Sequence, residues 1–170
     1  SKLIGVINGL SKKIRGDDGK TWEVDPRMMR RAVAFCSQIG NELKPGTSKN
    51  TAKILPLLSE QYNETLNEQE KAHSVRIQAK HIDGTMNAVA RNEIISWLKE
   101  EPEDKRECRI VSNVRCLSEG VDVPALDAVI FLSSRNSHID VVQSVGRVMR
   151  NFRKGQEGEK KYGYIIIPVV

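Results

Sequence analysis

The sequence predicts an α/β fold, a three-layer sandwich whose central sheet is mainly parallel. Five short apolar runs of strand length, rich in β-branched residues or alanine, are spread along the chain. Segments with helical spacing of apolar residues separate most of them. Strands that alternate with helices favour parallel pairing, and ligand sites then fall at the carboxyl ends of the strands. The five runs are 32–36, 75–79, 108–111, 128–132 and 164–170.

Helical stripes of apolar residues lie between these runs. They are formed by Leu55, Leu58, Tyr62 and Leu66, by Ala90, Ile94 and Trp97, and by Ile139, Val142, Val145 and Met149. Pro56 is expected to start or kink the first of these helices. At the beginning of the chain, residues 1–15 also carry apolar residues at helical intervals, and turn residues follow at 16–19. We therefore expect an initial helix and turn over residues 1–20.

The length of 170 residues suits one domain, 1–170, and the last apolar run ends in mid-pattern, as expected of a fragment of a longer protein. Hydrophobic residues make up 39% of the chain and charged residues 29%, which indicates a soluble globular protein rather than a disordered one. No apolar stretch approaches the roughly 18 residues of a membrane span, and no export signal is visible. We expect a cytoplasmic protein without a membrane partner.

The three cysteines are Cys36, Cys108 and Cys116, and they form no CxxC pair. An odd number of cysteines suits a disulfide framework poorly, so they are interpreted as buried thiols in a reducing compartment. The three histidines also lack the spacing of metal ligands. The sequence therefore predicts no metal site within this chain.

The net charge of +5 is compatible with a polyanionic partner. The charge is uneven, because residues 146–161 hold six basic and two acidic residues, whereas residues 99–107 hold five acidic and three basic residues. Many basic domains bind no nucleic acid, so this distribution is only suggestive.

The strongest chemical pattern is the segment 143–150, Gln-Ser-Val-Gly-Arg-Val-Met-Arg. On a helix, Gln143, Arg147 and Arg150 would lie at i, i+4 and i+7 and form one polar stripe. Guanidinium groups are permanently charged and planar, which suits phosphate oxygens, and Gly146 would let a ligand or another backbone approach closely. The alternative is an ordinary solvated helix face.

The context of this segment resembles a known family. Upstream lie Glu-Gly-Val-Asp-Val-Pro at 119–124 and an apolar run, and the arginine helix follows them in order. This order resembles motifs V and VI of superfamily 2 helicases, particularly their excision-repair and restriction-enzyme motor branches. Residues 30–37 resemble motif IV, and His-Ile-Asp-Gly at 81–84 followed by Arg91 resembles the glycine turn and helix that precede motif V. The resemblance covers residues 30–150.

The resemblance implies a RecA-like second motor lobe and assigns roles by position. Arg147 would be the principal arginine finger and Arg150 its partner at the γ-phosphate of ATP. Gln143, Gly120 and Asp122 would lie at the nucleotide. Residues that would contact a nucleic-acid backbone are Ser37, Gln38, Arg91, Ser112, Asn113 and Glu119. Outside motifs V and VI, a plain surface role is as good an interpretation of each polar residue.

A complete motor also needs a phosphate-binding loop and an acidic residue that holds Mg²⁺. The tempting Gly19-Lys20-Thr21 lacks the earlier glycine of such a loop, since Ile14 stands there, and no apolar run ends in an Asp-Glu pair. ATP and Mg²⁺ should therefore be bound mainly by an N-terminal lobe of the same polypeptide. We expect the fragment alone to be inactive, and the partner to be a nucleic acid, with DNA favoured over RNA.

Three alternatives remain open. The motor could translocate along duplex DNA without separating the strands. The lobe could be a non-catalytic module that binds nucleic acid or protein and retains only the fold. The chain could also be a separate α/β enzyme that happens to contain the arginine pattern.

Overall fold

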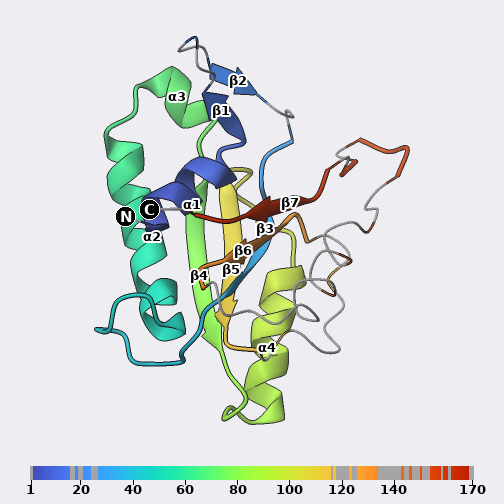
Figure 1. Ribbon diagram of the computed structural model, residues 1–170. Helices are drawn as coiled ribbons and strands as arrows, with labels where there is room; N and C mark the ends of the chain where they lie inside the picture. The colour runs from blue at the N-terminus through green and yellow to red at the C-terminus, as the bar shows by residue number, and fades with distance from the viewer. Residues whose placement is uncertain are drawn as a thin grey trace.

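The computed structural model describes residues 2–15, 18, 21–23, 27–115, 117, 123, 126–133, 143, 146, 150, 154–157, 159–160 and 162–168. Figure 1 shows the arrangement of the described elements. Its helices are α1 (Lys2–Leu10), α2 (Ser48–Glu64), α3 (Glu68–Ala72) and α4 (Ala88–Lys99). Its strands are β1 (Lys13–Arg15), β2 (Thr21–Glu23), β3 (Arg31–Phe35), β4 (Arg76–Ile82), β5 (Glu107–Asn113), β6 (Ala128–Phe131) and β7 (Tyr164–Ile166).

The central sheet has the strand order β4-β5-β3-β6-β7, and each neighbouring pair is parallel. All five predicted apolar runs contain a strand of this sheet. β3, β5 and β6 are within two residues of the predicted bounds, whereas β4 extends to Ile82 and β7 ends at Ile166. Because the strands are parallel, their carboxyl ends meet at one edge, and Figure 1 shows this edge at its lower end for β4 and β5. The predicted three-layer α/β architecture is confirmed.

Both faces of the sheet are covered, which gives the molecule two hydrophobic clusters. Along β3, Ala32 and Ala34 belong to the cluster under α1 and α2, whereas Val33 and Phe35 belong to the cluster under α4. This alternation follows from the two-residue period of a strand. Figure 1 shows α1 and α2 on one side of the sheet and α4 on the other. The larger side chains of β3 face α4, where the Phe35 and Phe131 rings stack with centroids 5.7 Å apart.

Helix α2 begins at Ser48, eight positions before the proline that was expected to start or kink it. Thr47 is its N-cap, and its side-chain oxygen accepts a hydrogen bond from the backbone N–H of Asn50. Pro56 lies inside the helix. Helix α4 begins in the same way, because the Asn87 side chain accepts from the Ala90 N–H at 2.8 Å. Both caps lie at the carboxyl edge of the sheet.

The initial helix is shorter than predicted. It ends at Leu10, and Ile14, which continued the helical spacing, lies in β1. Strand β1 pairs antiparallel with β2 in a separate two-stranded sheet. Lys12 has a φ of 55°, a left-handed conformation that ends the helix without a glycine. Its ammonium group, buried with the residue, donates to the Arg27 carbonyl oxygen.

In the part of the chain that the structure describes, no helix is both long and apolar enough to cross a membrane.

Candidate functional site

A cleft of about 660 Å³ opens at the carboxyl edge of the sheet. The segments that follow β3, β5 and β6 form part of its wall, together with the loop before α2. In a parallel sheet this edge is the usual position of a ligand site. Residues of the cleft that can contact a polar ligand are Lys2, Ser37, Gln38, Lys44, Thr47, Arg115 and Ser133.

The described lining of this cleft is basic. It includes Lys2, Lys44 and Arg115 and no aspartate or glutamate. Ser37 and Gln38, which the sequence singled out, are both exposed here directly after β3. Lys44 donates from Nζ to the Gln38 side-chain oxygen at 2.8 Å, so a cation stands beside the amide. A cleft with this lining suits an anionic ligand such as a phosphate.

The loop between β3 and α2 has a defined shape. Asn41 Oδ1 accepts from the N–H groups of Leu43 and Lys44, each at 2.9 Å, and the Thr47 hydroxyl is 2.9 Å from the Lys44 carbonyl oxygen. Gly40 has a φ of 61°, and a Cβ added there would lie 2.3 Å from Thr47 Cγ2. Only glycine fits this position, because a side chain would meet both backbone strain and Thr47.

The first turn of α2 does not offer its amides to the cleft. The Ser48 N–H donates to the Gln38 carbonyl oxygen at 2.8 Å, and the Lys49 N–H donates to Ile39 at 3.2 Å. The N–H groups of Asn50 and Thr51 are both bonded to Thr47. An anion in this cleft would therefore be held by side chains such as Lys44 rather than by the helix terminus.

Ser112 and Asn113 end β5 and were expected to contact nucleic acid, but both are fully buried. The Ser112 hydroxyl donates to the Ser48 carbonyl oxygen at 2.8 Å. Asn113 donates from Nδ2 to the Ala34 carbonyl oxygen at 3.1 Å and accepts from the Leu117 N–H at 3.1 Å. Hydrogen bonds within the fold thus use both side chains, and a contact of Ser112 or Asn113 with nucleic acid stays a prediction.

Asp83 and Gly84 form a turn after β4. The Asp83 carboxylate accepts from the backbone N–H of Thr85 at 2.8 Å and from its hydroxyl at 2.5 Å. The bond from the Thr85 hydroxyl, together with that from His81, lowers the pKa of Asp83 to about 2, against an opposing effect of burial. Arg91 follows on α4 and is half-buried, and it is not part of the lining described for the cleft.

The predicted arginine helix is described at only a few positions. Gln143 and Gly146 are helical, as predicted, and both are exposed. A Cβ on Gly146 would meet no atom within 4 Å, and Arg150 is exposed as well. Glu119, Gly120, Asp122 and Arg147 lie outside the described residues. Gln143, Gly146 and Arg150 are thus each open to solvent, and Arg150 lies in a bend rather than in a helix.

Sequence reasoning did not single out Lys44, Thr47 or Arg115. Lys44 lies in a loop next to Pro45 and Gly46, where no periodic sequence pattern marks a binding residue. Arg115 lines the cleft and has a left-handed backbone conformation with a φ of 60°. The Thr47 cap was readable in principle, since threonine before a helical segment is a common N-cap.

The comparisons with known proteins agree on one family. The family model of the helicase conserved C-terminal domain matches residues 37–152. Among solved structures, the chain is similar to the ATP-dependent type ISP restriction-modification enzyme LlaBIII bound to DNA. The identity is 38% and the TM-score 0.66, and the match covers 99% of this chain and 9% of that chain. The search of curated proteins returned no match.

More distant structures share the fold alone. The C-terminal part of the Fun30 ATPase domain has 14% identity and a TM-score of 0.52, with 97% of this chain and 40% of that chain covered. The E. coli DEAD-box protein SrmB bound to regulator of ribonuclease activity A has 16% identity and a TM-score of 0.52, with 98% and 68% covered. The chain spans less than a tenth of the length of the restriction-modification enzyme.

Proposed function

Because the chain belongs to the helicase conserved C-terminal domain family, within superfamily 2, we propose that it is the second motor lobe of an ATP-dependent DNA translocase or helicase. The observation that carries the proposal is the 38% identity, over 99% of this chain, to an enzyme described as ATP-dependent and bound to DNA. The lobe supplies arginine side chains for ATP hydrolysis and contacts for the nucleic-acid backbone.

The basic cleft is the proposed site for the nucleic-acid backbone. Ser37 and Gln38 offer polar groups, and Lys44 adds a positive charge beside them. These side chains suit phosphate and sugar oxygens rather than base edges, so binding is expected to depend on salt and little on sequence. DNA is preferred to RNA in this proposal because the most similar of the structures described above is bound to DNA.

The nucleotide would lie against the other proposed surface, the arginine helix. Arg147 and Arg150 would neutralise negative charge that develops on the γ-phosphate, because a guanidinium stays charged at any physiological pH. Gln143 would contact the nucleotide or the neighbouring lobe, and Gly120 and Asp122 would lie nearby. The exposure of Gln143, Gly146 and Arg150 supports this role, since a second lobe can reach them.

An N-terminal lobe of the same polypeptide would bind most of the ATP and its Mg²⁺. Within the described ranges, no cluster of histidine, cysteine, aspartate or glutamate is arranged to hold a metal ion. Closure of the two lobes would complete the site, and opening after hydrolysis would move the lobes along the backbone that both hold. This account does not require that the strands be separated, so translocation along duplex DNA is equally compatible with it.

The experiment is a DNA-stimulated ATPase assay on the full-length polypeptide that carries this domain. Arg147→Ala and Arg150→Ala should each lower kcat about a hundredfold or more, because each removes transition-state charge stabilisation. Arg76→Ala is the control, since Arg76 is an exposed arginine of the edge strand β4 and its ion pair is with Asp104. Unaltered turnover in both test variants would refute the finger assignment.

The same assay distinguishes the proposed motor lobe from the main alternative, a non-catalytic binding module. A non-catalytic module would bind DNA while the wild-type polypeptide shows no DNA-stimulated hydrolysis. Stimulated hydrolysis that depends on Arg147 excludes that alternative.

A further inference from the structure

A buried chain of hydrogen bonds joins three polar side chains at the carboxyl edge of the sheet. The Ser48 hydroxyl is 2.7 Å from His81 Nδ1, and His81 Nε2 is 2.6 Å from Asp83 Oδ2. The three residues come from the start of α2, the end of β4 and the turn after β4. The His81 side chain is 9% exposed and that of Asp83 is 3% exposed. None of the three is in the described lining of the cleft.

The direction of each hydrogen bond follows from the charge of Asp83. With a pKa of about 2, this carboxyl is ionised at neutral pH and can only accept. His81 Nε2 therefore carries a proton and donates to Asp83. In the neutral imidazole, Nδ1 is then an acceptor, and the single Ser48 hydroxyl proton goes to Nδ1 at 2.7 Å rather than to the Ser112 oxygen at 3.1 Å. Asp83 thus fixes the tautomer of His81 that can hold Ser48.

The arrangement is not a hydrolytic triad. Ser48 has no exposed surface, and its hydroxyl lies between His81 Nδ1 and the Ser112 hydroxyl, which is 3.1 Å away. A nucleophile must reach a substrate, and this oxygen cannot. A role in holding structure remains.

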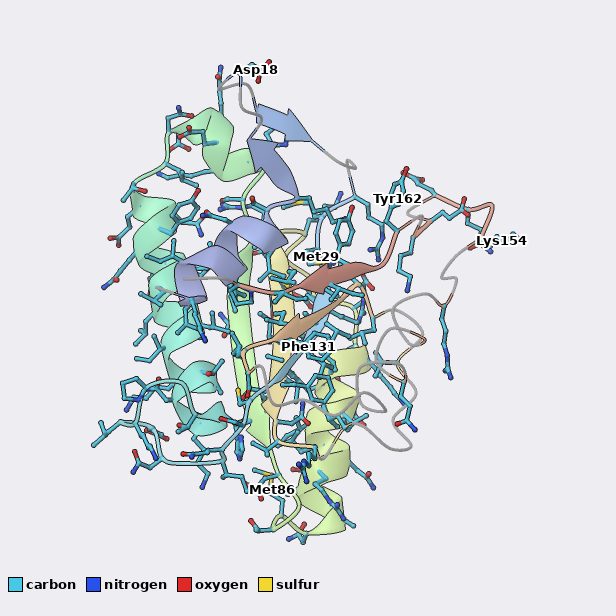
Figure 2. The ribbon with its side chains drawn as sticks, viewed as in Figure 1. Asp18, Met29, Met86, Phe131, Lys154 and Tyr162 are labelled. Carbon is cyan, nitrogen blue, oxygen red and sulfur yellow. The ribbon has the colours of Figure 1, made fainter. Side chains whose placement is uncertain are left out.

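The hydrogen-bond chain is connected at its two ends to two segments that were expected to contact nucleic acid, the one with Ser37 and Gln38 and the one with Arg91. On one side, the Ser48 N–H donates to the Gln38 carbonyl oxygen at 2.8 Å, so Ser48 holds the end of the segment that carries Ser37 and Gln38. On the other side, Asp83 holds Thr85 in the turn that leads to α4 and Arg91. Figure 2 shows the next residue, Met86, at the same lower end of the molecule to which the strands point.

We infer that His81 is a positioning residue for the DNA-binding cleft, which it shapes by holding Ser48 and, through Ser48, the loop that carries Gln38 and Lys44. This inference rests on the proposed function, because it concerns the same site. His81 itself does not touch the DNA. It fixes the first turn of α2 against β4, so the cationic loop keeps the shape in which its side chains converge.

The test measures DNA-stimulated ATPase of the full-length polypeptide against DNA concentration. His81→Ala should raise the DNA concentration for half-maximal stimulation about tenfold, as expected for loss of one buried hydrogen bond of the loop support. The kcat at saturating DNA should stay within about twofold, because the arginine helix is a separate element. Ser48→Ala should have the same effect as His81→Ala.

Two conservative variants separate positioning from a general loss of packing. His81→Asn places an amide oxygen where Nδ1 stands, so it keeps an acceptor for Ser48 and should restore most of the DNA affinity. His81→Gln keeps a donor near the Nε2 position for Asp83 but loses the acceptor for Ser48, and it should resemble His81→Ala. Equal weakening by the Asn, Gln and Ala variants would overturn the inference.

Ser59→Ala is the matched control. Ser59 is a second buried serine of α2, and its hydroxyl bonds Val75 and Ile77, away from the cleft. It should lower thermal stability to a similar degree without changing the DNA concentration for half-maximal stimulation. If Ser59→Ala raises that concentration as much as Ser48→Ala does, the effect is one of stability and the inference fails. A wild-type polypeptide without any DNA stimulation would instead refute the proposed function itself.

Discussion

The buried Arg31 side chain, at the start of β3, donates a hydrogen bond of 2.9 Å from Nε to the carbonyl oxygen of Leu98, at the end of α4. Its Nη2 atom also donates to the carbonyl oxygens of Lys99, at 3.1 Å, and Glu100, at 2.7 Å. The last carbonyl groups of a helix have no partner within the helix. The Arg31 guanidinium therefore caps the C-terminus of α4 and links this helix to the central strand β3.

Replacing Arg31 should destabilise the domain strongly. Arg31→Met leaves three carbonyl groups without their donor, and we expect a loss of about 3 kcal/mol in the free energy of unfolding. Arg31→Lys should cost only slightly less, because a single ammonium cannot reproduce the planar fork. Urea unfolding followed by circular dichroism measures both, and Arg76→Met, which removes an exposed ion pair with Asp104, should cost far less. A loss at Arg31 no larger than that at Arg76 would contradict this account.

The stability of the domain should fall in acid partly through Asp83. Its pKa is lowered from 3.8 to about 2 in the folded state, so it stabilises the fold above pH 4. That contribution, roughly 2 kcal/mol, is lost as the pH falls from about 4 to about 2. Thr85→Val removes the hydroxyl that contributes most to the shift, so the variant should lose less stability over this window. Unfolding free energies measured at several pH values give the slope.

The control for this measurement is Thr65→Val. The Thr65 hydroxyl is also exposed and donates to a carbonyl oxygen, that of Tyr62 at 2.7 Å, rather than to a carboxylate. The Thr65→Val variant should show the same dependence of unfolding free energy on pH, between pH 4 and pH 2, as the wild type. Identical slopes for all three proteins would show that Asp83 is not the group responsible.

Lys44 should contribute to DNA affinity although it was not predicted to do so. Lys44→Ala in the full-length polypeptide should weaken DNA binding about threefold to tenfold and lower the slope of log affinity against log salt by about one, as expected for one lost phosphate contact. Lys53→Ala is the control, because Lys53 pairs with Glu42 at 2.9 Å and is not in the described cleft lining. Fluorescence anisotropy over a salt series tests the difference. Equal effects of the two variants would indicate a general charge effect.

Cys36 and Cys108 should resist alkylation in the folded protein. Both thiols are buried, and burial raises the pKa of each, so little thiolate is present or accessible. After brief exposure to iodoacetamide at pH 8, peptide mass spectrometry should find these two residues unmodified. The same treatment in urea should modify both. Rapid labelling of Cys108 without urea would show that the sheet opens locally.

The sheet could be predicted from the sequence because its strands are buried on both faces. Such strands form continuous apolar runs, and β3 and β5 could be recognised from their own residues without knowing which strands they pair with. The hairpin β1–β2 could not be predicted in this way. Its first strand continues the spacing of α1, and the helix is ended by Lys12, whose left-handed conformation is supported by a tertiary bond to Arg27. Helix α3 was missed although the capping box of Asn67 and Glu70 marks its start.

The candidate site was predicted in part. Ser37 and Gln38 follow a strand at its carboxyl end, and their exposure follows from that position. Ser112 also lies at the end of a strand, yet it is buried against Ser48 at the start of α2. The sequence around Ser112 cannot reveal this contact, because Ser48 lies 64 positions earlier in the chain. No local pattern separates these two cases. The difference arises from which element covers each strand end, and that depends on the assembled fold.

Of the two left-handed glycines before α2, Gly40 and Gly46, the first has a practical consequence for protein engineering. Residues 42–45 are exposed and can be varied to change the proposed DNA contacts of the cleft. Any such library has to keep Asn41, whose side chain accepts hydrogen bonds from the N–H groups of Leu43 and Lys44, and also Gly40. A hydrogen atom at that one carbon is what allows Thr47 to close against the backbone. In directed evolution of this loop, Gly40 should therefore stay constant, and clones that replace it should be lost under selection for folded protein.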